Sequence, residues 1–380
     1  MSKVIIHAQV YTGSQVYTDG FIRYDDTVLA VGSMDEYQPE SSDTHVEDAQ
    51  GKLLVPGFID VHSHGGYGID NMDGDPREIN EMTQKMLSEG ITSYFPTTMT
   101  QSDENIEHSL AGIKQAKETN PMIQGIHLEG PFISVDYKGA QPAQFMRTAD
   151  AETMARWNDL SGGNIRLVTY APEVGDVSEF EDYCVANNIV LSAGHSGATY
   201  EQLKQSNASH VTHLFNGQLG LHHREIGVAG FALLEDDVYA EMIVDGFHIS
   251  PEMVKLAFKA KGASHTVLIT DSMRAKGLPD GESELGGQKV FVKDKQARLE
   301  NGSLAGSVLR FNDAFKNMIE FTGCSIADAV QMSSVNQARE FGLENKGSLS
   351  EGKDADFVVM NEEFQVVKTV LGGNMHEFKK

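Results

Sequence analysis

Histidine and carboxylate side chains stand at the ends of short apolar runs of this sequence: His62, His64, Glu129, His195, His213 and Asp271. His62 and His64 are two residues apart, so both imidazoles point to the same face of a strand. Imidazole nitrogens and carboxylate oxygens together form a ligand set for Zn²⁺ or Fe²⁺. Glu129 has two oxygens and could bridge two ions about 3.5–4 Å apart, as two-metal hydrolases require. These residue types indicate metal-assisted hydrolysis, in which Asp271 could act as general base.

Each of these residues also has a structural interpretation. A His-X-His pair can be two hydrogen-bonded core histidines. Glu129 could be an ion-pair partner in the floor of a barrel, and Asp271 could cap a following helix. His195 and His213 could each be a satisfied core side chain. The metal interpretation is favoured because all the candidate ligands fall at the same end of their strands.

Other histidines have weaker signals. His127 alternates with Glu129 and shares its face, which predicts a place in the layer around the ligands rather than on a metal. His210, His222 and His223 have no assignment from their sequence context.

Apolar runs alternate with helical patterns through the middle of the chain, and these runs must position the candidate ligands. The strand-like runs are 54–61, 92–96, 123–128, 165–170, 189–193, 210–215, 238–244 and 266–269. The helical patterns include 76–88, 103–117, 177–187, 251–261, 307–321 and 326–341. This alternation predicts an α/β fold with a closed (β/α)8 TIM-like barrel, whose strands end at one mouth. A doubly wound open sheet is the alternative, but no Gly-rich phosphate loop follows the first strand.

Both ends of the chain are β-rich, with short strand-like runs separated by turn residues. We expect residues 1–52 and 347–380 to pair into one small β-sandwich domain, built from both chain ends. Residues 53–346 then form the barrel as the catalytic domain.

Charge and cysteine content narrow the possible partners. The chain has 380 residues and a formal net charge of −25, which opposes approach to nucleic acid or to an anionic membrane. It has two cysteines, Cys184 and Cys324, far apart, as is typical of a reduced intracellular protein. The sequence has neither a signal-peptide pattern nor the run of about 18 apolar residues that a membrane span requires. We therefore expect a cytoplasmic protein with no nucleic-acid or membrane partner.

Several segments resemble the amidohydrolase superfamily and, within it, the family of N-acetylglucosamine-6-phosphate deacetylases: 56–65, 127–132, 194–196, 213–217 and 270–272. Many amidohydrolases share the His-X-His pair, whereas Leu-Glu-Gly-Pro-Phe and His-Leu-Phe-Asn are much more specific to the deacetylases. The resemblance covers nearly the whole chain. It implies a metal-dependent homodimer that hydrolyses the acetamide of N-acetyl-D-glucosamine 6-phosphate to acetate and D-glucosamine 6-phosphate, in amino-sugar catabolism and recycling.

The resemblance also divides the ligands between two ions per subunit, Zn or Fe. One ion would be held by Glu129, His195 and His213, and the other by His62, His64 and the bridging Glu129, with Asp271 contributing. Asp271 would take a proton from metal-activated water as general base and return it to the leaving amine as general acid.

Substrate contacts implied by the resemblance are Ala140, Gln141, Asn216, Gly217, Arg224, His248, Leu304, Ala305 and Gly306. Arg224 offers a planar fork for the phosphate and His248 a second donor, although Arg224 could equally pair with Glu225 at the surface. Some family members carry a histidine in place of Gln141. A glutamine amide can donate a hydrogen bond but cannot be a cation, so the task of polarising the carbonyl shifts toward a metal.

Two other functions stay open on these residues. Another amidohydrolase, such as a cyclic-amide hydrolase or a nucleobase deaminase, would use a similar barrel, but no strand-borne lysine that could be carboxylated stands in the ligand set. A catalytically silent barrel used as an interaction scaffold would be expected to lose ligands, and this chain retains all of them. We therefore expect an enzyme with a small-molecule amino-sugar phosphate as substrate.

Overall fold

The computed structural model describes residues 1–378 and contains two compact units. One unit combines Met1–Ile59 and Gln84–Ser93 with the chain from Phe311 onward, and the other combines Asp60–Thr83 with Tyr94–Arg310. The predicted fold class is confirmed, because a curled parallel sheet and a separate sheet built from both chain ends are present. The predicted division at residues 52 and 346 stays a prediction, since compactness alone does not show which segments fold as a domain.

Parallel strands alternate with helices through the middle of the chain, as the sequence pattern predicted. The strands are β6 (Phe58–Ser63), β9 (Ile91–Pro96), β10 (Ile126–Glu129), β11 (Ile165–Tyr170), β12 (Val190–Ala193), β13 (His210–Val211), β14 (Tyr239–Ile243) and β15 (Thr266–Ile269). Strands β10 to β15 pair in sequence order, and β6 pairs with β9. A parallel bridge between Thr97 and His127 links β9 to β10, and the N–H of Asp271 donates to the carbonyl of His62 at 2.8 Å. These contacts close the curled sheet on itself.

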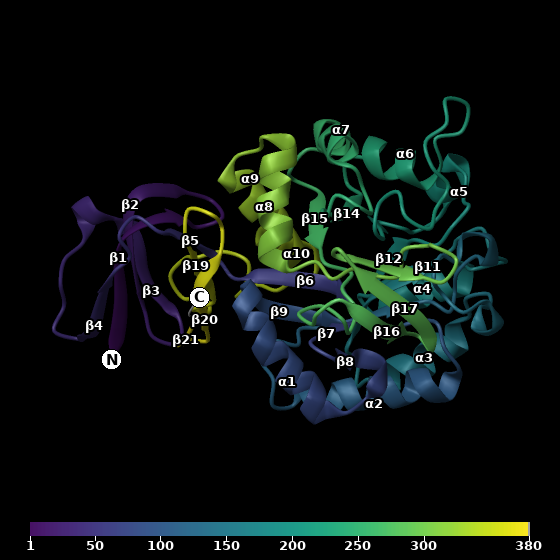
Figure 1. The fold of residues 1–380 in the computed structure, drawn as a ribbon, viewed down its shortest axis with the longest axis horizontal. Helices are drawn as coiled ribbons and strands as arrows, with labels where there is room; N and C mark the ends of the chain where they lie inside the picture. Colours follow the sequence, from purple (N-terminus) through teal and green to yellow (C-terminus); the bar gives the residue numbers. More distant parts are fainter. Residues whose placement is uncertain (379–380) are drawn as a thin grey trace. The chain divides into compact units, whose positions relative to one another are not determined.

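Helices lie around the outside of these strands, most visibly α2 to α7 (Figure 1). The helices of the second unit are α2 (Asp103–Lys117), α3 (Ala151–Leu160), α4 (Ser178–Ala186), α5 (Tyr200–Gln205), α6 (Gly227–Leu234) and α7 (Pro251–Lys261). Helix α1 (Pro76–Met86) has residues in both units, and α8 (Phe311–Thr322), α9 (Ile326–Val330) and α10 (Asn336–Glu340) belong to the first unit. Their ends follow from local chemistry: Ser250 accepts the N–H of Met253, Pro251 opens α7, and Gly262 at φ 75° ends it.

The first predicted strand, 54–61, is wrong as a single element. It is broken at Gly57 into β5 (Leu53–Pro56), which belongs to the terminal sheet, and β6, which begins the barrel. A Cβ on Gly57 would lie 2.0 Å from Oγ1 of Thr92, so only glycine fits where the chain passes from one sheet to the other.

The terminal sheet has eight strands and draws on both ends of the chain, as predicted. Its strands are β1 (Ser2–Tyr11), β2 (Val16–Tyr24), β3 (Val28–Ser33), β4 (Asp43–Asp48), β5, β19 (Phe357–Met360), β20 (Val366–Leu371) and β21 (Asn374–Glu377). Strand β5 is the junction, because it pairs in parallel with β1 and antiparallel with β19. Purple and yellow strands lie together in Figure 1 for this reason. Ile22, Tyr24 and Phe357 are fully buried in the core of this sheet.

A three-stranded antiparallel sheet follows β15 and was not predicted. It consists of β16 (Gly281–Leu285), β17 (Gln288–Lys293) and β18 (Gln296–Leu299). The signal was present, because Gly286 and Gly287 separate two alternating runs in the way of a tight hairpin. Its apolar face packs on Met99 and Met273, next to the strand ends of the barrel.

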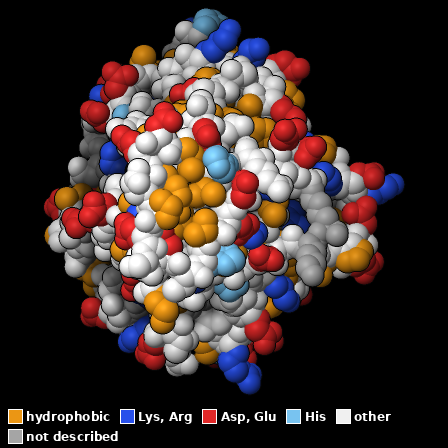
Figure 2. Space-filling view, turned by 90° about the vertical axis from the view of Figure 1, so that its left-hand side faces the viewer, with side chains coloured by type: hydrophobic (Ala, Val, Ile, Leu, Met, Phe, Trp, Pro, Cys, Tyr) orange, Lys and Arg blue, Asp and Glu red, His pale blue; other side chains and the backbone are white. Residues whose placement is uncertain are grey.

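Surface and membrane features can be read from the described residues. No helix within residues 1–378 combines the length and the apolar character needed to cross a membrane. Figure 2 shows acidic side chains spread over one face, basic side chains scattered near its edges, and a group of hydrophobic side chains near its centre.

We predict that Gly57→Ala lowers the free energy of unfolding by about 1–3 kcal/mol, because the new methyl group overlaps Thr92. Urea unfolding followed by circular dichroism measures the change. Gly220→Ala is the matched control, since a Cβ there meets nothing within 4 Å. Equal stability of the two variants would contradict the steric argument.

Candidate metal centre

The barrel brings the predicted ligands together at the carboxyl ends of its strands. His62 lies in β6 and Glu129 ends β10, while His195, His213 and Asp271 each follow the end of a strand by two residues. All of these side chains, with His64, are buried, and the most exposed residue, Asp271, has 7% of its surface accessible.

Glu129, His195 and His213 form the first group of ligand atoms. Oε1 of Glu129 lies 3.1 Å from Nε2 of His195 and 3.0 Å from Nε2 of His213, and the two nitrogens are 3.1 Å apart. Ligands at 2.0–2.1 Å from a tetrahedral zinc ion lie about 3.4 Å from one another. This triangle of nitrogen and oxygen atoms therefore fits one divalent ion.

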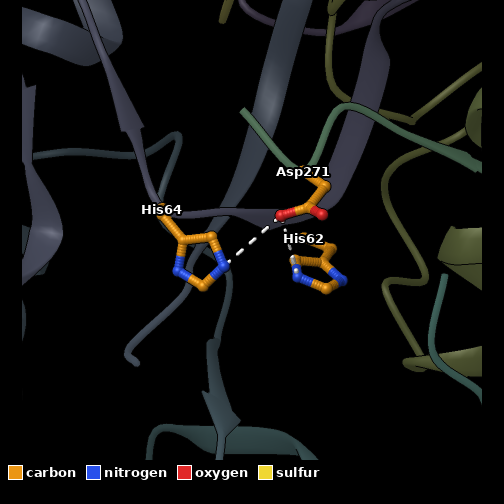
Figure 3. Close-up of side chains that lie close together, drawn as sticks. All are labelled: His62, His64 and Asp271. Carbon is orange, nitrogen blue, oxygen red and sulfur yellow. Dashed lines mark ion pairs between the residues drawn. The ribbon is translucent and has the colours of Figure 1, made fainter. Parts of the chain in front are cut away.

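His62, His64 and Asp271 form the second group, drawn in Figure 3. Both imidazoles approach the carboxylate of Asp271, with Nε2 of His62 at 3.5 Å and Nε2 of His64 at 3.4 Å from Oδ1. Nε2 of His62 is buried without a hydrogen-bond partner. An unpartnered ring nitrogen that faces carboxylates is the atom that a metal ion would use, so this group also fits a divalent ion.

Glu129 lies between the two groups. Its Oε2 is 3.0 Å from Nε2 of His64, whereas its Oε1 is shared by His195 and His213. Each oxygen therefore faces a different group, which is the geometry that a bridging carboxylate needs.

Three of the predicted ligands adopt a left-handed backbone. The φ angles are 48° at His195, 28° at His213 and 46° at Asp271. Residues other than glycine avoid this region because the Cβ crowds the backbone, and such strain gathers at functional sites. Hydrogen bonds hold one of these turns on both sides: the N–H of Asp271 donates to the carbonyl of His62, and its carbonyl accepts from Ser307.

Further hydrogen bonds fix the orientation of the imidazoles. Nδ1 of His195 lies 2.9 Å from the carbonyl of Tyr137, and Nδ1 of His62 lies 2.8 Å from Oε2 of Glu241. In each ring the outer nitrogen is used, so that Nε2 faces the carboxylates. His127 is in the surrounding layer: its Nε2 lies 2.7 Å from Oγ1 of Thr169.

Sequence reasoning missed Glu241. It is fully buried in the middle of β14, where Glu241 is the charged residue of an otherwise apolar Tyr-Ala-Glu-Met-Ile run. That contrast was the available signal, because an acidic side chain is almost never fully buried unless it is paired. His210, which had no assignment, places Nε2 3.1 Å from Oε1 of Glu241.

The histidines control the charge of the carboxylates. Burial alone would raise the pKa of Glu129, but the nearby histidines His62, His195 and His213 lower that pKa well below its usual range. Burial opposes ionisation of Asp271 as well, yet His62 and His64 lower its pKa. Both groups are therefore carboxylates at neutral pH and able to bind a cation or accept a proton.

A cavity of about 280 Å³ opens onto the metal groups. Of the predicted substrate contacts, its walls include Ala140, Gln141, Asn216, Gly217, His248, Leu304 and Gly306. Arg224 and Ala305 do not line it: Ala305 is buried in the neighbouring core, and Arg224 is exposed, with Nη1 2.6 Å from Nε2 of His223. Leu285 of the unpredicted three-stranded sheet also lines the cavity.

Two side chains at this cavity are held by neighbours. Oε1 of Gln141 accepts the N–H of Thr100, and its Nε2 donates to Oε2 of Glu129, each at 2.9 Å. The amide nitrogen of Gln141 is thereby directed at the bridging carboxylate. Nδ1 of His248 lies 2.7 Å from Oδ2 of Asp245.

The chain is similar to several known proteins. Residues 53–375 match the amidohydrolase family. An N-acetylglucosamine-6-phosphate deacetylase of Bacillus subtilis is 40% identical over 98% of this chain and 97% of its own. An N-acetylgalactosamine-6-phosphate deacetylase of Escherichia coli O157:H7 is 33% identical over 88% of this chain and 90% of its own. A mutant N-acetyl-D-glucosamine-6-phosphate deacetylase of Mycobacterium smegmatis, solved with N-acetyl-D-glucosamine-6-phosphate, superposes with a TM-score of 0.92 at 29% identity, covering 98% of this chain and 99% of that one.

We predict that Zn²⁺ binding releases a proton. Burial lowers the pKa of His64, but its hydrogen bonds to Asp271 and Glu129 outweigh burial and raise that pKa to about 9. At neutral pH the metal-free protein thus holds a proton on His64 that Zn²⁺ must displace. The apparent Zn²⁺ affinity should therefore rise with pH from neutral toward about 9, as His64 loses its proton. Calorimetry in buffers of different ionisation enthalpy counts the released protons, and a pH-independent affinity would contradict this view.

Proposed function

This chain belongs to the amidohydrolase family, and we propose that it hydrolyses N-acetyl-D-glucosamine 6-phosphate to D-glucosamine 6-phosphate and acetate. The observation that carries the proposal is the position of Glu129 between two histidine groups at the floor of a cavity. A deacetylase that matches 98% of this chain at 40% identity supports the same reaction.

We propose that two divalent ions bind here. Glu129, His195 and His213 would hold the first, and His62, His64 and Asp271 would hold the second, with Glu129 bridging. Zinc and iron both suit imidazole and carboxylate ligands. A bound ion of this kind brings the pKa of water down to about 7, so that hydroxide is available near neutral pH.

Asp271 is the residue proposed to move the proton. It is ionised at neutral pH because His62 and His64 counter the effect of burial on its pKa, and it lines the cavity in which the acetamide would lie. Its carboxylate takes a proton from water as the new C–O bond forms. It returns that proton to the sugar nitrogen as the C–N bond breaks, so acetate and a free amine leave.

Recognition of the phosphate is proposed to involve two copies of the chain. Within one described chain, no lysine or arginine lines the cavity, and His248 is the cavity residue outside the metal groups that can carry positive charge. Arg224 is exposed and is not among the residues that line the cavity of its own chain. A homodimer in which Arg224 of one subunit reaches the cavity of the other would supply the planar fork that a phosphate favours.

A second candidate substrate is the galacto epimer, N-acetyl-D-galactosamine 6-phosphate. A relative named for that activity is 33% identical over 88% of this chain. We favour the gluco substrate because the relative with the higher identity, 40%, is named for it.

We also propose that the enzyme works in the cytoplasm. A phosphorylated sugar carries charge that the apolar interior of a bilayer excludes, so such a substrate stays where it is made. Cys184 and Cys324 are both free thiols, as is usual in a reducing compartment.

We predict strong acetate release from N-acetyl-D-glucosamine 6-phosphate and little from the same sugar without phosphate. The reason is that binding energy from the phosphate, remote from the reacting amide, is used to orient the acetamide. The measurement is the rate of acetate release by metal-reconstituted protein from each sugar. The galacto epimer serves as a third substrate. Equal turnover with and without phosphate would remove the phosphate site. A lack of acetate from any of these sugars, with metal bound, would point to another amidohydrolase reaction.

We predict that Asp271→Asn lowers kcat by about 10²–10⁴-fold, because an amide cannot take the proton from water. Metal content, measured by mass spectrometry of the dialysed protein, should stay near that of the wild type. Asp70→Asn is the control, since Asp70 is a buried carboxylate that caps a short 3₁₀ turn, and asparagine also caps well. Undiminished turnover by the Asp271 variant would show that another group is the base.

A further inference from the structure

We propose that Glu241 is a positioning residue that anchors one ligand from each of the two metal groups. It lies behind the ligands on β14 and is absent from the cavity lining, so it acts through them and does not touch substrate. The inference rests on the proposed function only in requiring that the two groups bind metal.

A single oxygen of Glu241 carries the link. Oε2 lies 2.8 Å from Nδ1 of His62, which belongs to the group with His64 and Asp271. The same oxygen accepts the backbone N–H of His213 at 3.0 Å, and His213 belongs to the group with Glu129 and His195. Both groups can therefore depend on Glu241 although none of its atoms binds either metal.

The contact with His62 selects the form of the ring that can bind metal. A carboxylate accepts hydrogen bonds, so Nδ1 keeps its proton and Nε2 is the nitrogen that would bind a metal. Nε2 is the atom that faces Asp271 at 3.5 Å and Glu129 at 3.7 Å. Loss of the carboxylate would let the ring change tautomer or turn away.

The contact with His213 holds a strained backbone. His213 has a φ of 28°, which an L-residue avoids. Oε2 of Glu241 accepts its N–H, and the backbone carbonyl of Glu241 accepts the next N–H along the chain, that of Leu214, at 2.8 Å. The strained turn is thus tied to β14 on consecutive amides, which aims Nε2 of His213 at Glu129.

A metal-ligand role for Glu241 itself fits the contacts less well. Ligand atoms of His62, His127 and Glu241 lie within 4.8 Å of one another, so they resemble a third metal group. Nε2 of His127, however, lies 2.7 Å from Oγ1 of Thr169, and the 2.8 Å between His62 and Glu241 is a hydrogen-bond distance. The geometry is that of a carboxylate behind a histidine ligand.

We predict that Glu241→Gln weakens Zn²⁺ binding at both sites, each by about 10–100-fold, the usual cost of losing such a partner. Competition with a chromophoric chelator measures both dissociation constants without any substrate. Glu181→Gln is the matched control: Glu181 is also buried in the barrel unit and accepts hydrogen bonds from Tyr170 and Asn207, but touches no ligand. It should leave both Zn²⁺ affinities unchanged.

Three results would overturn the proposal: unchanged affinities, weakening at one site alone, or a third tight Zn²⁺ that both Glu241→Gln and His127→Asn remove. Because zinc is the probe, a protein that binds two ions yet releases no acetate would refute the proposed function and leave this inference standing.

A second test uses the wild-type protein, so it does not depend on whether a variant of Glu241 folds. In zinc-loaded protein labelled with ¹⁵N-histidine, His62 should carry its proton on Nδ1, seen as a slowly exchanging imidazole proton that His62→Asn removes. A proton on Nε2 of His62 would overturn the proposal.

Discussion

The arrangement of the barrel mouth depends on the need to stabilise the buried, ionised carboxylate of Glu129. With 1% of its surface exposed, it has lost nearly all its hydration, and a charge buried in this way costs several kcal/mol unless opposite charge lies close to it. The acidic chain, with a net charge of −25, offers no such help at long range. Imidazole nitrogens from three other strands lie 3.0–3.1 Å from its oxygens, and a divalent ion would supply positive charge. The strands, the strained turns and the buried Glu241 can all be understood as ways of holding those imidazoles around one carboxylate.

The sequence predicted the barrel and the grouping of the candidate ligands because both rest on local patterns. A histidine or carboxylate at the end of an apolar run has its position determined by the strand before it, so His62, Glu129 and His213 could be placed together without coordinates. Glu241 was missed because its partner, His62, lies on a strand far away in the sequence and becomes its neighbour only in the folded sheet. The break at Gly57 escaped for a similar reason: the atom that excludes a side chain there belongs to Thr92, on another strand.

Left-handed backbone at His195, His213 and Asp271 explains how short strands can deliver side chains to one point. A regular strand would alternate its side chains between the two faces, and β13 has only two residues before the chain turns. Changing the sign of φ just after the strand redirects the side chain inward. The strain is local, whereas the hydrogen bonds that offset it extend to neighbouring strands. Loss of these hydrogen bonds would therefore disturb both the turns and the positions of the candidate ligands.

The junction strand β5 also has an edge that stays unpaired during synthesis of the chain. Ribosomes deliver β1 to β5 early, but the antiparallel partner of β5, β19, begins at Phe357. Until β19 has been synthesised, one edge of β5 displays unpaired amide and carbonyl groups next to a hydrophobic core. A product that ends before Phe357 keeps that edge permanently, and an open edge is a template for aggregation and a mark for proteolysis. Residues Phe357–Met360 therefore act on a strand made about 300 residues earlier, because they cover the edge of β5 that the preceding residues leave open.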